Sequence, residues 1–353
     1  MNTAARRFAA GLGLLALLAP GARAETYAAR EICECVVTSL SADGRAATGQ
    51  LNYSQQTFRW AVGEGLQPLG RGTMRKLGAP YGWPAISGDG QTIASTIMDD
   101  TRRYAIQGRW TAATGWQQLP LPADVAINET RVASVANGLS RDGAVVAGHY
   151  PDLTGEGRPS RWSADTGIQA LGYGGEVNAV NGDGRVLVGE QAGNAMVWID
   201  GAPIALGAGM AFGVNAAGDI VVGGAPRAPS GRLTPAMWVW RDGAWHRRLL
   251  GTVAGQGFSV GYATGVSDDG RIVVGHGWWA DGGWRPERAF IWTAPDGLVE
   301  AEQYFESRGY PVSQRLFVKR IGAISGDGRV IGVVGTDVAT GHHRSLAVER
   351  VDP

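Results

Sequence analysis

Aromatic and basic side chains are concentrated in the segment 276–285, which reads HGWWADGGWR. Its three Trp residues offer flat apolar faces with an indole N–H donor, a combination that suits sugar rings and other amphipathic ligands. The alternative is that these rings pack against one another over the scaffold, because large apolar side chains more often pack than bind. The candidate ligand-binding residues of this segment are His276, Trp278, Trp279, Trp284 and Arg285.

A second candidate group occupies one position of a repeated phrase. His149 and His276 each directly follow the Gly that closes an aliphatic triplet, and Glu190 holds the same place in another copy. Two His and one Glu are residue types that bind metals, and His can act as a general base. Equivalent positions in different copies can lie far apart, and a polar residue at the start of a loop is ordinary. We therefore expect neither a metal site nor a cofactor.

Linear catalytic motifs give little support to an enzyme. The sequence contains no HExxH, no phosphate-binding GxxxxGK[ST] and no dinucleotide fingerprint between a strand and a helix. Some enzymes collect their catalytic groups from separate repeats, so this lowers the expectation of catalysis without removing it. The sequence identifies no catalytic residue.

The two cysteines, Cys33 and Cys35, are placed at C-x-C in the apolar run EICECVV. Alternation along a strand would send both side chains to one face, where a bridge between them would be strained. The first interpretation is two small buried thiols. The second is a redox-active or intermolecular pair in an oxidising compartment.

These candidates must be positioned by a repeated unit. Each copy has a small or aliphatic stretch, an Asp-Gly turn, an aliphatic triplet ending in Gly, and later a Trp followed by a Gly turn. A unit of this size cannot bury its apolar faces alone, so the chain must form an array. The copies of the phrase span residues 38–49, 84–95, 137–148, 178–189, 212–223, 264–275 and 322–335.

Turn residues divide each unit into short strand candidates, which is typical of an all-β array. Asp183-Gly184 and Asp200-Gly201 are predicted as two-residue hairpin turns, in which positive φ values favour Asp and Gly. The strands of the fourth copy are predicted at Glu176–Val180, Arg185–Gly189, Ala195–Ile199 and Pro203–Leu206. The recurring Trp of the third strand is Trp60, Trp110, Trp162, Trp198, Trp240 or Trp292.

Seven units of four strands predict a single domain over residues 25–353, a seven-bladed β-propeller. An elongated β-solenoid is the alternative, because a repeat alone does not show that the array closes. One feature favours closure. The last unit ends after Ser345–Arg350 without a fourth strand, and the strand-like segment Glu25–Val37 precedes the first unit without a partner. That segment would complete the last blade and leave no unpaired edge.

Connection lengths predict two different faces of the ring. The first-to-second and third-to-fourth turns are short, whereas the second-to-third connections and those between units vary, as in Arg71–Trp83 and Val299–Arg320. In an up-and-down blade the variable connections emerge on one side, here called the elaborated face, and the short turns on the other, the plain face. Binding residues concentrate on variable loops held by a rigid scaffold, so we expect the site on the elaborated face.

Residues 1–24 are predicted as a signal peptide. Arg6 and Arg7 precede an apolar run, and Ala22-Arg23-Ala24 offers a small-x-small cleavage site. The segment holds three of the 32 basic residues and none of the 32 acidic ones, so the remainder has no basic excess for nucleic acid. No later stretch is long and apolar enough for a membrane-spanning helix. We expect a monomer without membrane insertion.

The phrase S-x-D-G-R-x-V-V-G, followed by A-F-x-W-T and a G-L-x-x-L-G turn, resembles the HAF family of probable bacterial extracellular repeats. The similarity is greatest at Ser267–Gly275 with Ala289–Thr293, and at Phe58–Trp60 with Gly65–Gly70. The fifth copy departs most, with Ala217 in place of Asp. The resemblance implies an extracellular, propeller-like protein and supplies no catalytic residues.

The sequence therefore predicts a secreted or periplasmic binding module whose ligand, a glycan or a protein, lies on the elaborated face. The alternative is a polysaccharide-active hydrolase or lyase with its site at the channel mouth.

Overall fold

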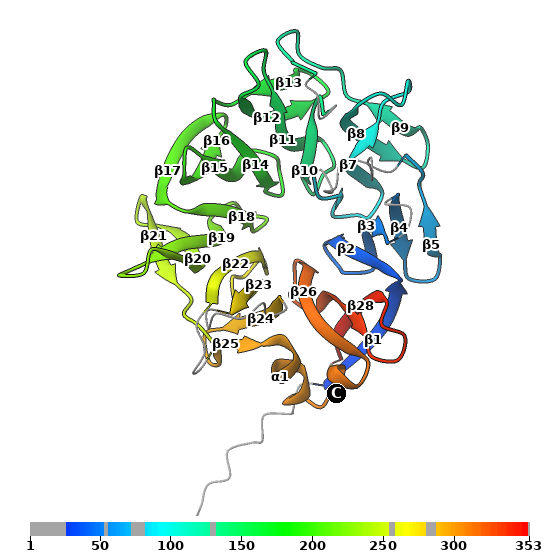
Figure 1. Cartoon of the computed structure of the whole chain (residues 1–353), viewed down its shortest axis with the longest axis vertical. Coiled ribbons are helices and arrows are strands. Elements are labelled where there is room, and N and C mark those ends of the chain that lie inside the picture. Colours follow the sequence, from blue (N-terminus) through cyan, green and yellow to red (C-terminus); the bar gives the residue numbers. More distant parts are fainter. Residues whose placement is uncertain are drawn as a thin grey trace, which may run out of the picture.

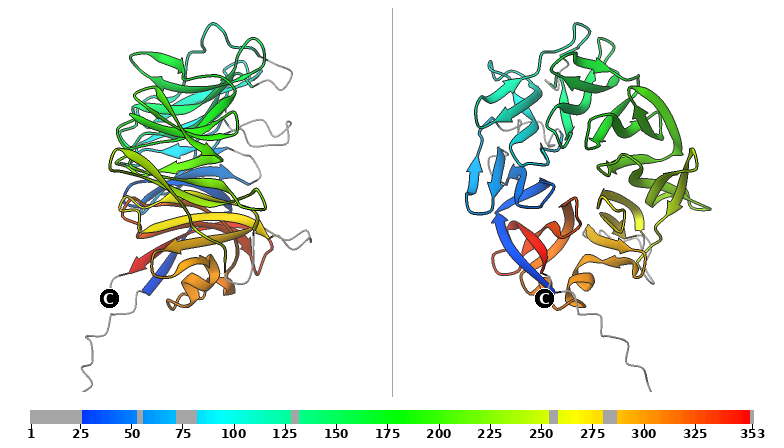
Figure 2. Two further views of the ribbon diagram at one scale, coloured as in Figure 1. Left: turned by 90° about the vertical axis from the view of Figure 1, so that its left-hand side faces the viewer. Right: turned by 180° about the vertical axis from the view of Figure 1, so that it is seen from behind.

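Seven four-stranded antiparallel sheets stand as blades round a central channel in the part of the chain that the structure describes (Figure 1). The structure is a computed structural model, and it describes residues 26–52, 56–71, 82–127, 132–253, 258–279 and 287–351. The predicted signal peptide lies outside these residues. The seven-bladed propeller is confirmed, and the solenoid is wrong because the sheets close into a ring, which Figure 2 shows from its edge and from behind.

The blades follow the chain in order, each with its first strand innermost. Blade 1 contains β2 (Cys35–Leu40), β3 (Ala46–Leu51), β4 (Thr57–Ala61) and β5 (Gly65–Pro68), and blade 2 contains β6 (Ala85–Ile86), β7 (Thr92–Met98), β8 (Ala105–Thr111) and β9 (Gly115–Gln118). Blade 3 contains β10 (Val135–Leu139), β11 (Val145–Pro151), β12 (Gly157–Ser163) and β13 (Gly167–Ala170), and blade 4 contains β14 (Gly175–Val180), β15 (Val186–Gln191), β16 (Asn194–Ile199) and β17 (Ala202–Ala208).

Blades 6 and 7 have longer inner strands than the others, and a helical link joins them. Blade 5 contains β18 (Met210–Val214), β19 (Ile220–Arg227), β20 (Arg232–Arg241) and β21 (Ala244–Leu249), and blade 6 contains β22 (Phe258–Val266), β23 (Ile272–Trp279), β24 (Arg288–Thr293) and β25 (Gly297–Glu300). Helix α1 (Ala301–Glu306) and a 3-10 turn (Val312–Gln314) lead to blade 7, which contains β26 (Leu316–Ile324), β27 (Val330–Asp337), β28 (His343–Val351) and β1 (Thr26–Cys33).

The apolar core lies between neighbouring blades, because the central strands β3, β7, β11 and their equivalents are buried on both faces. The recurring Trp of the third strand lies opposite the aliphatic triplet of the second strand, as Trp198 lies opposite Leu187. In blade 5 this position belongs to Trp238, which pairs with Val221 and is 1% exposed. The prediction of Trp240 was wrong: β20 runs two residues further, and Trp240 is 42% exposed at its end.

The Asp-Gly turn between the first two strands is not a two-residue hairpin, so the prediction for Asp183-Gly184 was wrong: five residues, 181–185, connect β14 to β15, and Gly184 has positive φ whereas Asp183 does not. In blade 1, the Ser41 hydroxyl donates to Asp43 Oδ1 at 2.7 Å, and Asp43 Oδ1 accepts from the Arg45 N–H at 2.9 Å. Within this turn Gly44 has a positive φ, of 69°, whereas Asp43 does not. The phrase therefore encodes a longer S-x-D-G turn that Ser and Asp stabilise. The prediction does hold for Asp200-Gly201, with φ values of 49° and 85°.

The Gly of this turn is also required by the neighbouring blade. A Cβ atom on Gly44 would lie 2.5 Å from Val330 Cβ. Blade 1 and blade 7 therefore approach each other as closely as the other pairs of neighbouring blades do. Each turn Gly meets the first residue of the preceding blade's second strand in the same way. The pairs are Gly44–Val330, Gly90–Ala46, Gly143–Thr92, Gly184–Val145, Gly218–Val186, Gly270–Ile220 and Gly328–Ile272.

Replacing one turn Gly should therefore cost more than its backbone conformation alone. In Gly184→Ala the new Cβ would overlap Val145 Cγ2, and φ is 77°. We expect a loss of about 1 kcal/mol for the positive φ and about 1–3 kcal/mol more for overpacking, measured by urea unfolding. Gly63→Ala is the matched control, because φ is 87° there and nothing lies within 4 Å of the new Cβ. Equal losses in the two variants would contradict the packing role.

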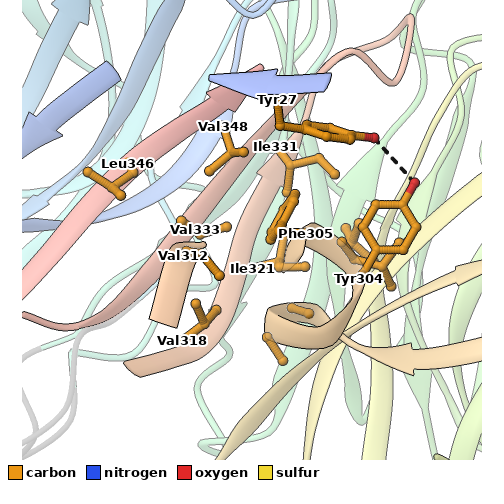
Figure 3. Close-up of a cluster of buried hydrophobic side chains, with 14 of the residues drawn as sticks. Tyr27, Tyr304, Phe305, Val312, Val318, Ile321, Ile331, Val333, Leu346 and Val348 are labelled. Atoms are coloured by element: carbon orange, nitrogen blue, oxygen red, sulfur yellow. Dashed lines mark hydrogen bonds between the residues drawn. The ribbon is translucent and has the colours of Figure 1, made fainter. Parts of the chain in front are cut away.

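The N-terminal strand closes the ring as predicted. β1 pairs antiparallel with β28 from Thr26↔Val351 to Cys33↔Ser345 and forms the outer strand of blade 7. The predicted segment Glu25–Val37 is divided at Glu34, where the chain bends and then enters blade 1 as β2. Figure 3 shows the cluster that β1 joins: Tyr27 packs beside Phe305 of α1, and its hydroxyl lies 3.3 Å from that of Tyr304.

The two cysteines form a disulfide, Cys33–Cys35, with Cα atoms 5.2 Å apart. The expectation of two free thiols was wrong. The physical reason is the bend at Glu34: Cys33 ends one strand and Cys35 begins another, so they are not alternate residues of a single extended strand. The bridge covalently joins the last blade to the first at the point where the ring closes.

Candidate functional site

The two faces differ as the connection lengths predict. Five-residue S-x-D-G connections, such as 41–45 in blade 1, emerge on the plain face together with the short third-to-fourth turns. The opposite face carries connections of unequal length, from residues 192–193 in blade 4 to residues 338–342 in blade 7, and the link 301–315 that contains α1. The inner strand of each blade runs from the elaborated face to the plain face, and these strands together surround the central channel.

Backbone hydrogen bonds join the S-x-D-G turns to one another on the plain face. In six of the seven turns the residue after the first Ser or Asn donates its N–H to the carbonyl of its counterpart in the next blade, as Ala42 does to Gly88 at 2.9 Å; in blade 5, Ala216 donates to the Asp268 side chain instead. The last link returns from Gly326 to Ala42, also at 2.9 Å, so the ring is continuous across the chain ends. We call this group the turn ring; its members are Ala42, Gly88, Arg141, Gly182, Ala216, Asp268 and Gly326.

One side-chain ion pair crosses the turn ring. Arg141 of blade 3 donates from both terminal nitrogens to the Asp268 carboxylate of blade 6, at 2.6 and 2.7 Å. Asp268 Oδ1 also accepts the Ala216 N–H at 3.2 Å and so completes the ring at blade 5. A Cβ atom on Gly326 would lie within 2.8 Å of both guanidinium nitrogens, so the pair reaches blade 7 as well. The pair therefore crosses the ring, and we expect it to close the channel at the plain face.

A cavity of about 400 Å³ occupies the channel above this closure. Residues of the first strands of all seven blades line it, and Trp83 and His276 do so toward the elaborated face. This volume is within the range of small-molecule sites, roughly 300–1,000 Å³. Because the Arg141–Asp268 pair crosses the plain-face end, we expect a ligand to enter the cavity from the elaborated face.

A bulge in the inner strands places polar side chains at the cavity wall. The register shifts by one residue at Thr38, Asn137 and Asn178, among others. Each of these side chains donates to a carbonyl of the next blade: Thr38 to Pro84 at 2.6 Å, Asn137 to Val177 at 2.9 Å and Asn178 to Ala211 at 3.0 Å. Because each Asn uses its NH2 group in this way, its amide oxygen is left as an acceptor.

Aromatic rings of blades 5 and 6 line a second part of the cavity at Phe212, Tyr262 and His276, and Trp278 packs against the last two. The ring centroids of Phe212 and Tyr262 lie 5.1 Å apart, and those of His276 and Trp278 lie 5.8 Å apart. Tyr262 contacts both His276 and Trp278, with centroids 6.4 Å away. We call these four residues the aromatic wall. Trp278 packs against its neighbours, which was the alternative stated for this segment, and it is also 37% exposed, so part of its apolar surface faces outward.

The other residues of the Trp-rich segment are only partly described. Trp279 ends β23, and its backbone pairs with Phe258. Trp284 and Arg285 lie outside the described residues, so their place in the site stays a prediction. Trp83, which the sequence did not single out, is 45% exposed beside the cavity and adds a second aromatic surface on the elaborated side.

His276 lies beside a buried ion pair. Its Nε2 is 3.2 Å from Glu287 Oε1, while Glu287 Oε2 accepts the Arg320 Nε–H at 2.5 Å. Burial lowers the pKa of His276 to about 3, and the Arg320 guanidinium contributes in the same direction. Burial raises the pKa of Glu287, which the hydrogen bond from Arg320 opposes. His276 is therefore neutral near pH 7 and can offer one donor and one acceptor.

His149 and Glu190 both lie beside a third residue, Glu176. His149 Nδ1 is 3.6 Å from Glu176 Oε2, and Glu176 pairs with Glu190 across β14 and β15. Burial lowers the pKa of His149 to about 4. Burial and the neighbouring Glu190 raise the pKa of Glu176. This group belongs to blades 3 and 4 and is not brought together with His276 of blade 6, which contacts Glu287 instead.

No metal centre is found among the described residues, where no three His, Cys, Asp or Glu side chains are grouped to hold an ion. Within the same residues, no helix is long and apolar enough to cross a membrane.

Known structures share the fold at low identity. The β-propeller domain of the Trilobed protease from Pyrococcus furiosus, which has an open velcro topology, gives a TM-score of 0.56 at 10% identity, covering 91% of this chain and 97% of that one. U3-55K gives 0.51 at 14% identity, covering 92% and 98%. The Cps50 (Swd1) propeller domain of Myceliophteria thermophila gives 0.50 at 11% identity, also covering 92% and 98%. These similarities show the fold alone.

No protein-family model matches the sequence, and no curated protein is similar to it at a significant level. The resemblance to the HAF repeats therefore stays a prediction.

Proposed function

We propose that this protein is a binding module, secreted or periplasmic, whose glycan or protein ligand contacts the elaborated face at the end of the central cavity. The observation that carries the proposal is the aromatic wall, which continues from the cavity at Tyr262 and His276 to the exposed face of Trp278. Exposed aromatic surface beside fixed hydrogen-bonding groups is typical of binding sites on rigid scaffolds. The predicted signal peptide and the resemblance to extracellular repeats support the location.

Substitution of Trp278 tests the site. We expect Trp278→Ala to weaken binding of any glycan or protein selected by the wild type at least tenfold, or about 1.4 kcal/mol, because it removes most of the exposed apolar contact area. Trp240→Ala is the matched control: Trp240 is similarly exposed but packs on Trp245 at the outer edge of blade 5, with ring centroids 5.5 Å apart. Affinities should be measured by calorimetry. Unchanged affinity in Trp278→Ala would place the site elsewhere.

A polysaccharide-active hydrolase or lyase is the second candidate. It is favoured by the pair Glu176 and Glu190, since a carboxyl whose pKa is raised beside another carboxylate is suited to general acid catalysis. Product release from a glycan by the wild type, lost in Glu190→Gln and His149→Gln, would promote this function. Binding without turnover would favour the binding module.

A further inference from the structure

The central cavity holds no uncompensated charge among the described residues that line it. Its two cationic side chains are Arg141 and Arg320, and both are paired with carboxylates, Asp268 and Glu287. A charged ligand group that entered the cavity would lose its hydration without gaining a free counter-charge. The lining therefore selects against ionic ligand groups.

The closure at the plain face favours a polymeric ligand that enters the cavity by one of its chain ends. The turn ring and the Arg141–Asp268 pair lie across the plain-face end of the channel, so we expect that a polymer cannot thread it. A polypeptide entering end-on would bring a charged terminus to the bottom of this cavity. The end of a neutral polysaccharide carries only hydroxyl groups and meets no such cost.

The hydrogen-bonding groups of the wall suit hydroxyl groups. Asn137 and Asn178 present amide oxygens as acceptors, since their NH2 groups donate to Val177 and Ala211 of the next blades. The second kind of polar group is the Tyr262 hydroxyl, which can donate a hydrogen bond. A hydroxyl group can donate to the first set and accept from the second. The aromatic wall beside them can cover the apolar face of a sugar ring.

We infer that the cavity binds the uncharged terminal residue of a polysaccharide chain, inserted end-on from the elaborated face with Arg141–Asp268 as the floor. This rests on the proposed function and narrows its ligand from a glycan or protein to a neutral glycan end. The preceding sugar residues then reach the exposed Trp83 and Trp278 at the elaborated side.

The test compares linear neutral probes with a cyclic probe, which has no chain end, and with a charged linear probe. Thermal shift and calorimetry would be run on the purified chain with linear maltohexaose, cellohexaose and chitohexaose. Cyclohexa-amylose is the matched probe without an end, and hexagalacturonate is the matched charged probe. We expect at least one linear neutral hexasaccharide to bind, and its affinity to exceed that of both matched probes at least tenfold. Equal or tighter binding of cyclohexa-amylose or hexagalacturonate, or no shift with any neutral probe, would overturn the inference.

A cavity-filling variant locates the bound end. Val180 lines the cavity and is only partly buried, so Val180→Phe should fill the space where the terminal residue lies. We expect at least a tenfold loss of affinity for the linear probe with an unchanged unfolding transition; retained affinity would contradict end-on insertion. Should this variant fold poorly, the comparison of linear and cyclic probes decides alone. A peptide ligand whose binding is lost in Trp278→Ala would overturn this inference and leave the proposed function standing.

Discussion

A chain that begins at Glu34, and so lacks β1, is expected to lose more than about 5 kcal/mol of stability. Tyr27 and Ile32 are buried, at 9% and 5% exposure, and removing two such side chains costs about 1.5–3 kcal/mol each. The truncation also removes the hydrogen bonds between β1 and β28 and leaves β28 as an unpaired edge. Because domains are stable by only about 5–15 kcal/mol, we expect the truncated chain to unfold or aggregate at 37 °C.

This loss should be measured by urea unfolding and calorimetry. The control is a chain that begins at Thr26, which keeps the whole of β1. A second control, Tyr27→Phe, removes the hydroxyl that lies beside that of Tyr304 and keeps the buried ring, and it should cost about 1 kcal/mol. If the chain beginning at Glu34 unfolded within a few degrees of the chain beginning at Thr26, closure of the ring by β1 would not stabilise the fold.

The stability of the protein should fall steeply between pH 6.5 and pH 4. The pKa values of His149 and His276 are lowered to about 4 and about 3, so both are neutral in the folded protein over this range, whereas unfolded His takes up a proton below pH 6.5. The contribution of each histidine to the free energy of unfolding is therefore fully present above pH 6.5. It is lost as the pH falls toward the pKa of that histidine in the folded protein. For each residue, the free energy of unfolding changes by at most about 1.4 kcal/mol per pH unit.

Three other groups oppose this slope. The pKa values of Glu176, Glu287 and Glu302 are raised in the folded protein, chiefly by burial, so their protonation at low pH favours folding. The decisive quantity is therefore the difference between variants. His149→Gln and His276→Gln should each flatten the dependence of the unfolding free energy on pH by up to about 1.4 kcal/mol per unit, measured by urea titrations at pH 4.5–7.5. Parallel curves for wild type and variants would contradict the burial of neutral histidines.

The sequence allowed the fold to be predicted because its repeat carries local chemistry that recurs in every blade. The Gly of each S-x-D-G turn, the aliphatic triplet and the recurring Trp are fixed by contacts within a blade or with its neighbour. Errors arose where two local patterns compete. Trp238 and Trp240 have the same parity along one strand, and only the pairing register shows which of them is buried. The bend at Glu34 divides a continuous apolar run that alternation alone could not divide.

The candidate site was less predictable because it depends on contacts between distant blades. Trp278 and His276 were identified from an unusual local composition. Arg141 and Asp268 are 127 residues apart, and only the closed ring brings them together. Asn137 and Asn178 could have been found as polar residues inside otherwise apolar inner strands, a pattern that the bulge explains. Trp83 follows a long connection, and nothing in its local sequence marks it as a cavity residue.

The most direct test of the account is a crystal structure of the protein with the probe that raises its melting temperature most. We expect difference density in the central cavity, with the ligand end directed toward Arg141–Asp268 and its apolar face against Tyr262 and Trp278. Density confined to another surface, such as the Trp240–Trp245 edge of blade 5, with the cavity unchanged, would contradict the central claim that this channel is the binding site.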